Sequence, residues 1–153
     1  MQPKADHARA RGLAIQTGYL GSDHEKVDFV STVDVFSHIP HFDLFLEDVT
    51  RALKPQGELF IETGNLADLR HRSEFPGELG LPDHLVFAGE HHLRGYLERA
   101  GFEILRVERQ RIDGAVNLLK NIVKKTMGRA VKVTLPYSSA YRQLRVRARR
   151  RTV

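Results

Sequence analysis

Residues 27–33 constrain the fold most strongly, because they form an almost continuous run of apolar and β-branched side chains. Such a run is typical of a strand in a parallel sheet with helices on both faces. Further strands are predicted at residues 13–17, 58–63 and 103–108, and amphipathic helical patterns lie between the later ones. This alternation of strand and helix predicts an α/β fold with a mostly parallel sheet.

The predicted helices have recognisable ends. One helix is predicted at residues 41–53 and ends at residues 54–57 (Lys-Pro-Gln-Gly), because proline cannot continue a helix and glycine tolerates the reversal. A second helix is predicted at residues 89–100, with Gly101 as its C-cap. Residues 65–83 contain several glycines and prolines and show no clear period, which predicts a long loop of the kind that forms lids or binding segments.

Charge is distributed very unevenly along the chain. Through residue 104 there are 10 Lys and Arg against 17 Asp and Glu, whereas residues 105–153 hold 14 against 2. The chain is therefore an acidic body with a strongly basic tail. In this tail, residues 116–125 predict an amphipathic basic helix and residues 141–149 predict a final edge strand.

We therefore divide the chain into an α/β domain at residues 1–108 and a basic extension at residues 109–153 that packs on the same sheet. The extension could contact the phosphates of RNA, of a nucleotide sugar or of a lipid-linked acceptor, although we do not expect nucleic acid to be the main partner. Its helix could instead lie on an anionic membrane surface, or it could simply cover the sheet while the arginines face solvent.

Several classes of protein are excluded by composition. The chain has 153 residues, enough for one domain, and contains no cysteine, so disulfides and thiolate chemistry are absent. No apolar run approaches the roughly 20 residues that span a bilayer, and the first seven residues lack the apolar core of a signal peptide. We expect a soluble, cytoplasmic protein.

Three stretches carry a resemblance to a known family: residues 27–40, residues 45–63 and residues 84–103. They are similar, in this order, to the fourth strand and the acidic turn after it, to a helix with a Leu-Lys-Pro-Gly-Gly turn and the fifth strand, and to a late helix with its Ala-Gly-Phe exit. The family is the class I S-adenosylmethionine-dependent methyltransferases that act on small molecules. The resemblance implies a partial Rossmann-like sheet, with helices on both faces and a late antiparallel edge strand. It also implies S-adenosylmethionine as the cofactor and methyl transfer to a small-molecule acceptor.

The sequence also departs from the family pattern. It has no Gly-x-Gly-x-Gly loop, the segment that lets the cofactor approach the backbone, and two central strands would be missing. A partner chain could supply them, the sequence could be a truncated form, or the strands could rearrange. Ser37 stands where many relatives have glutamate, and Gln56 replaces the first glycine of the turn. A non-catalytic subunit that pairs with an active methyltransferase, and a nucleic-acid-binding module, therefore remain as alternatives.

The resemblance also implies which residues contact the cofactor. The corresponding positions are Gly18, Tyr19 and Leu20 at the adenine, and Thr32, Val33 and Asp34 at the methionine moiety. The alternative is that these are ordinary core, half-buried or turn residues.

His38 is the candidate general base, since a neutral imidazole titrates near working pH; the alternative is that it packs locally at a helix start. Some relatives hold a divalent cation with an acid, a glutamate and a histidine of this turn. Only Asp34 and His38 of that set remain, so no metal site is predicted. His84 and the pair at 91–92 are too dispersed for a zinc site.

Overall fold

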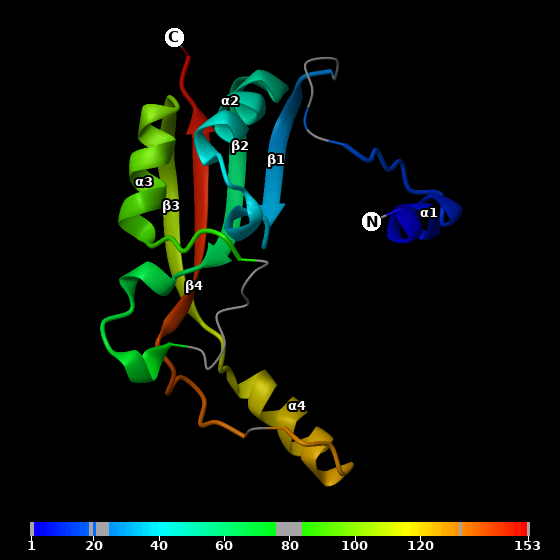
Figure 1. Cartoon of the computed structure of the whole chain (residues 1–153), viewed down its shortest axis with the longest axis vertical. Coiled ribbons are helices and arrows are strands. Elements are labelled where there is room, and N and C mark those ends of the chain that lie inside the picture. The colour runs from blue at the N-terminus through cyan, green and yellow to red at the C-terminus, as the bar shows by residue number, and fades with distance from the viewer. Residues whose placement is uncertain (1, 19, 21–24, 76–83, 132, 153) are drawn as a thin grey trace.

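A computed structural model describes residues 2–18, 20, 25–75, 84–131 and 133–152. Its four strands are β1 (Val27–Val33), β2 (Leu53–Gly64), β3 (Phe102–Arg111) and β4 (Tyr141–Arg150), in the sheet order β1-β2-β4-β3. β1 pairs in parallel with β2, and β4 runs antiparallel to both of its neighbours. β1, β2 and β3 therefore point the same way, and their carboxyl ends lie at one edge of the sheet (Figure 1). The α/β fold predicted from the sequence is confirmed.

The predicted position of the last strand is wrong, because β4 is internal. Its central residues pair with β2 on one side (Leu59 with Ala148) and with β3 on the other (Val107 with Val146). Leu144, Val146 and Ala148 are fully buried. The alternating pattern of residues 141–149 predicts a strand with one buried face, and an internal strand of a sheet with one exposed face has the same pattern.

Two helices cover one face of the sheet. They are α2 (Phe42–Ala52) and α3 (Glu90–Arg99), and their inward positions fall at three- and four-residue spacing, as a core-facing helix requires. The buried core that they form with the strands is Phe42, Leu46, Val49, Leu93 and Leu97 against Leu59, Ile61, Phe102, Leu144, Val146 and Ala148.

The expectation of helices on both faces is wrong for the described residues. The opposite face carries charged rows that pair across strands: Arg145 bonds Glu62 (2.5 Å), while Arg147 and Arg149 bond Glu58 (2.6 and 3.0 Å). Arg147 and then Arg149 hold the pKa of Glu58 below its ordinary value. These ion pairs let the face remain in water without a helical cover.

The remaining helices stand apart from the sheet. In Figure 1, α1 (Gln2–Ala10) lies to one side of β1, and the segment that follows it, predicted as a strand at 13–17, is not a strand. α4 (Ala115–Thr126) extends beyond the end of β3 and has no buried residue, whereas β4 is a strand of the sheet. None of the described helices is long and apolar enough to cross a membrane.

Residues 54–57 contain one departure from the family pattern, and their backbone conformation shows what it costs. Gln56 has a φ of 63°, in the left-handed region that favours glycine. A Cβ added to Gly57 would lie 2.9 Å from the Lys54 carbonyl oxygen and 3.3 Å from that of Asp28, so this glycine is required by close backbone approach. The predicted turn is thus a bulge inside β2, where its register against β1 shifts.

Candidate functional site

The carboxyl end of β1 presents the residues expected at the methionine moiety. Thr32 is buried, and its hydroxyl donates to the Phe60 carbonyl oxygen (3.3 Å). Val33 is 54% exposed, and the exposed Asp34 donates its backbone N–H to the Glu62 carbonyl oxygen (3.0 Å). The structure therefore brings these three together at the edge where open α/β sheets bind ligands.

Asp34 also has an unusual backbone conformation. Its φ is 58°, in the left-handed region, which costs about 1 kcal/mol in residues other than glycine and is best tolerated by Asn and Asp. Residues held in such conformations cluster at binding sites, so this outlier supports a functional reading of the turn.

His38 lies in the short helix η1 (Phe36–His38), directly after this turn. The backbone N–H groups of Leu85 and Val86 donate to the Ser37 carbonyl oxygen (2.7 and 3.2 Å), which holds the segment before α3 against η1. The imidazole rings of His38 and His84 consequently stack edge to face, with centroids 4.9 Å apart. Two imidazoles thus lie just beyond the end of β1.

The residues expected at the adenine lie elsewhere. Gly18 and Leu20 line a cavity of about 700 Å³ together with Val27, at the start of β1, and Ala52. A seven-residue strand spans about 20 Å, so the described part of this cavity does not adjoin Val33. Tyr19 lies outside the described residues. The structure thus separates the two expected groups of cofactor contacts.

The end of β1 fits one side of a cofactor that has apolar and polar parts, because Val33 offers an apolar surface and Asp34 a carboxylate. The described residues do not enclose such a ligand there. Nor do they include any group of three or more His, Asp or Glu side chains that could hold a metal ion.

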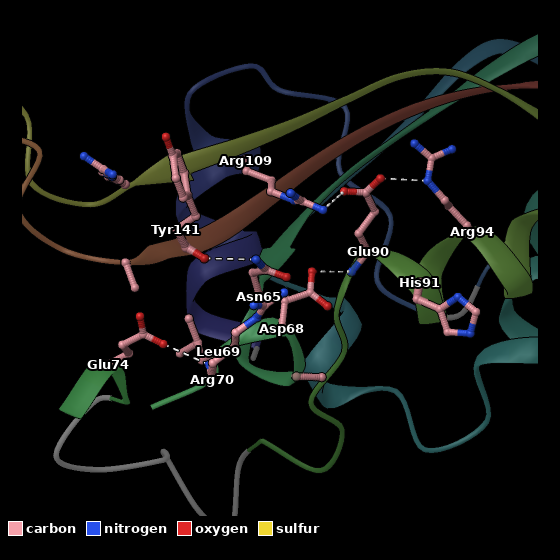
Figure 2. A pocket seen from close by; sticks show the side chains of 13 residues that line it. Asn65, Asp68, Leu69, Arg70, Glu74, Glu90, His91, Arg94, Arg109 and Tyr141 are labelled. Carbon is pink, nitrogen blue, oxygen red and sulfur yellow. Dashed lines mark hydrogen bonds and ion pairs between the residues drawn. The ribbon is translucent and has the colours of Figure 1, made fainter. Parts of the chain in front are cut away.

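A second feature of the same sheet edge was not predicted: a cavity of about 820 Å³, here called the polar pocket (Figure 2). It lies between the end of β2, the start of α3, the end of β3 and the start of β4. Its polar lining consists of Asn65, Asp68, Arg70, Glu74, Glu90, His91, Arg94, Arg109, Arg111 and Tyr141.

Glu90 organises one wall of the polar pocket. Figure 2 shows its carboxylate between Arg94 (2.8 Å) and Arg109 (2.7 Å), and its backbone N–H donates to the Asp68 carboxylate (3.0 Å). Burial alone would raise the pKa of Glu90, but Arg94 and Arg109 outweigh it and hold that pKa below its ordinary value. Glu90 is therefore an anion that fixes two guanidinium groups, and Asp68 caps the start of α3.

Asn65 is the most buried of the polar residues that line the polar pocket. It is only 2% exposed, and its side-chain N–H donates to the Tyr141 carbonyl oxygen (2.9 Å), which fixes the orientation of the amide. Its Oδ1 then has no hydrogen-bond partner among the described residues. Arg111 stacks on the Tyr141 ring (4.5 Å), and its Nε is likewise buried and unpartnered there. Two buried polar atoms of pocket-lining residues, one acceptor and one donor, thus lack a hydrogen-bond partner among the described residues.

Sequence reasoning missed the polar pocket because its residues lie just past predicted strand ends. Arg109 and Arg111 belong to β3, which continues three residues beyond the predicted end at residue 108. Asn65 follows the predicted strand at residues 58–63, and the sequence predicts a loop from this residue on. A polar residue directly after a buried strand is the signal that could have identified it.

Comparison with known proteins identifies the family to which the chain belongs. Residues 3–107 match the family described as a methyltransferase domain. No curated protein matches the sequence significantly. Similar solved structures include a candidate sarcosine dimethylglycine methyltransferase from Galdieria sulphuraria (16% identity, TM-score 0.63, 98% of this chain and 65% of that one). They also include an S-adenosylmethionine-dependent methyltransferase from Mesorhizobium loti (18% identity, TM-score 0.58, 94% of this chain and 75% of that one). A third is the cyclase SpnF (17% identity, TM-score 0.60, 97% of this chain and 61% of that one).

The fold is thus that of the Rossmann-like methyltransferases, with a mixed four-stranded sheet in the described residues. Because the match covers more than two thirds of the sequence, the chain belongs to the methyltransferase-domain family, whose relatives include S-adenosylmethionine-dependent enzymes. It spans 61% and 65% of the length of two of the similar structures. S-adenosylmethionine is the cofactor that the family assignment indicates.

Proposed function

We propose that the chain takes part in methyl transfer from S-adenosylmethionine to a small-molecule acceptor at the carboxyl edge of its sheet. The observation that carries this proposal is the family match over residues 3–107. The cofactor supplies a methyl group already activated by a sulfonium, so the protein has mainly to place the reactants and exclude water. Val33 and Asp34 would contact the methionine moiety, with Thr32 behind them. A contact of Gly18, Tyr19 and Leu20 with the adenine stays a prediction, because Gly18 and Leu20 line a cavity at the start of β1.

The polar pocket supports a small polar acceptor. It lies at the same sheet edge as Asp34, because β1, β2 and β3 are parallel. Asn65 Oδ1 would accept a hydrogen bond from an N–H or O–H of the acceptor, and Arg111 would donate one to an anionic group. An acceptor that carries both groups would satisfy both buried atoms. His38 would act as general base where the acceptor has to lose a proton, with His84 beside it.

Calorimetric titration with S-adenosylhomocysteine tests the cofactor role. We expect one molecule to bind per chain, and Asp34→Asn to weaken binding about tenfold, the effect of losing one charged hydrogen bond. Asparagine tolerates a positive φ, so this variant removes the charge and keeps the turn. Asp28→Asn is the matched control, because Asp28 lies on the same strand and is 83% exposed. If the Asp34→Asn variant bound S-adenosylhomocysteine as tightly as the wild-type chain, the proposed contact between Asp34 and the cofactor would be contradicted.

The acceptor role of the polar pocket is tested separately. Methyl transfer is measured over a panel of small amines and hydroxy acids, and Asn65→Ala is expected to raise the KM for the acceptor and leave S-adenosylhomocysteine affinity unchanged. Asn117→Ala, in the exposed helix α4, is the control. Unchanged acceptor KM in the Asn65→Ala enzyme would exclude the pocket from the site.

A non-catalytic subunit is the second candidate function, and the free edge of β1 favours it. β1 pairs only with β2 in the described structure, and its outward residues Phe29 and Val33 are 52% and 54% exposed. An uncovered apolar edge strand is a template for pairing with another chain. Cofactor binding that appears only in a stoichiometric complex with a second chain would favour this candidate. Binding by the isolated monomer would exclude it.

A further inference from the structure

Helix α4 exposes an apolar face that nothing in the described structure covers. The residues of this face are Val116, Leu119, Ile122, Val123 and Met127, with exposed fractions between 43% and 71%. Their spacing of three and four residues places them on one side of the helix. Figure 1 shows α4 projecting away from the sheet, beyond the carboxyl end of β3.

The ends of α4 are defined even though its sides are not packed. The backbone N–H of Gly128 donates to the Lys125 carbonyl oxygen and that of Arg129 to the Lys124 carbonyl oxygen (3.0 Å each), a pattern that terminates a helix at a glycine with positive φ. A 12-residue helix without tertiary packing is marginal in water. An additional surface is therefore needed to stabilise it.

The charge around this apolar face has one sign. Lys120 borders the face on one side and Lys125 on the other, with Lys124 and Arg129 nearby. Residues 114–153 contain 11 Lys and Arg and no Asp or Glu. An apolar stripe flanked by cations is the pattern of a helix that lies in the interface of an anionic membrane, with its apolar face about 5–10 Å into the headgroup region.

We infer that α4 docks the protein on an anionic lipid bilayer surface. Charge complementarity selects this occupant. A second copy would bring two basic helices together, and nucleic acid would leave the apolar face uncovered. The strand arginines 145, 147 and 149 are already paired with Glu58 and Glu62, whereas the lysines of α4 form no ion pair with a described residue. Docking would hold the carboxyl edge of the sheet near the bilayer, because α4 follows the end of β3.

The attachment of α4 is also well defined. At its base, Asp113 accepts hydrogen bonds from the backbone N–H groups of Ser138 and Ser139 (2.9 and 2.8 Å) and from both of their hydroxyls. The segment that leaves the sheet before α4 and the segment that returns after it are thus tied together. The two ends of the segment that contains α4 are therefore joined at Asp113, and this joint fixes where the segment leaves the sheet.

Sedimentation with lipid vesicles tests the inference on the full chain. We expect binding to vesicles of phosphatidylcholine mixed with phosphatidylglycerol, with a gain of helical circular dichroism, and no binding to pure phosphatidylcholine. Leu119→Ser with Val123→Ser should weaken binding about tenfold or more, because both apolar side chains leave the lipid. Lys124→Glu with Lys125→Glu should weaken it too.

The control is Leu44→Ser, since Leu44 is 57% exposed on α2, away from α4. A variant is compared with the wild-type chain only if the two have the same melting curve, which shows that the variant is folded. Equal binding to both kinds of vesicle, or wild-type binding by the Leu119→Ser/Val123→Ser chain, would overturn the inference. The inference would also be overturned if the wild-type chain were a dimer and the Leu119→Ser/Val123→Ser chain a monomer. Binding to RNA that depends on the lysines of α4 and not on Leu119 would overturn it as well. None of these readouts depends on methyl transfer.

Discussion

At the scale of single residues, Gln56 shows how a departure from a sequence pattern can carry strain. Its φ of 63° explains why the family has glycine at this position. We predict that Gln56→Gly raises the free energy of unfolding by up to about 1 kcal/mol, because relief of the left-handed conformation outweighs the larger backbone entropy that glycine loses on folding. Urea denaturation measures this. Gln110→Gly, in the extended strand β3, should instead destabilise the protein; stabilisation by both or by neither would contradict the explanation.

Asp113 provides the clearest pH dependence. The Ser139 hydroxyl, followed by the Ser139 backbone N–H and the Ser138 hydroxyl, lowers the pKa of Asp113 from 3.8 to about 2. A carboxyl group whose pKa is lower in the folded state stabilises the fold above the unfolded pKa near 4, and this contribution is lost as the pH falls toward 2. We predict that Asp113→Asn lowers the melting temperature at pH 6 and that the difference from wild type shrinks between pH 4 and pH 2. A difference that stays constant over this range would contradict the assignment.

Residue types near strand ends were only partly informative. The resemblance to the methyltransferase family indicated Thr32, Val33 and Asp34, and the ordinary chemistry of imidazole indicated His38. The structure places all four at one end of β1. The sequence could not indicate Asn65, because the features that distinguish this residue are its burial and an unpartnered oxygen, which depend on the returning strand β4 76 residues later.

At the scale of elements, the position of β4 has a measurable consequence. Val146 is fully buried in an internal strand, whereas Val33 is 54% exposed on an edge strand. We predict that Val146→Ala costs about 2 kcal/mol in the free energy of unfolding, and that Val33→Ala costs much less. Chemical denaturation of the two variants measures this comparison. Similar small losses would place β4 at the edge of the sheet after all.

The helices and strands were largely predictable, since their signals are local. Apolar spacing marked α2 and α3, and Gly101, with a φ of 82°, ended α3 as expected. Strand order and the covering of the sheet faces were not predictable in this way. They depend on which side chains meet across strands, as the pairing of Glu58 with Arg147 and Arg149 shows.

At the scale of the whole molecule, the described structure leaves two surfaces of the chain open. One is the edge of β1, which pairs only with β2 among the described residues. The other is the apolar face of α4, which is exposed to solvent and belongs to the strongly basic extension. The split in charge was evident from the sequence, whereas the projection of α4 was not, because an amphipathic pattern does not say what covers it.

The central claim is that the cofactor binds at the carboxyl edge of the sheet, and chemical-shift mapping with S-adenosylhomocysteine on the ¹⁵N-labelled chain tests it most directly. The account predicts that the backbone amides of Val33, Asp34 and His38 shift on titration, with those near the start of β1 following only if Gly18 and Leu20 move toward that edge. Shifts confined to Val27 and residues 15–18, around the cavity at the opposite end of β1, would contradict it.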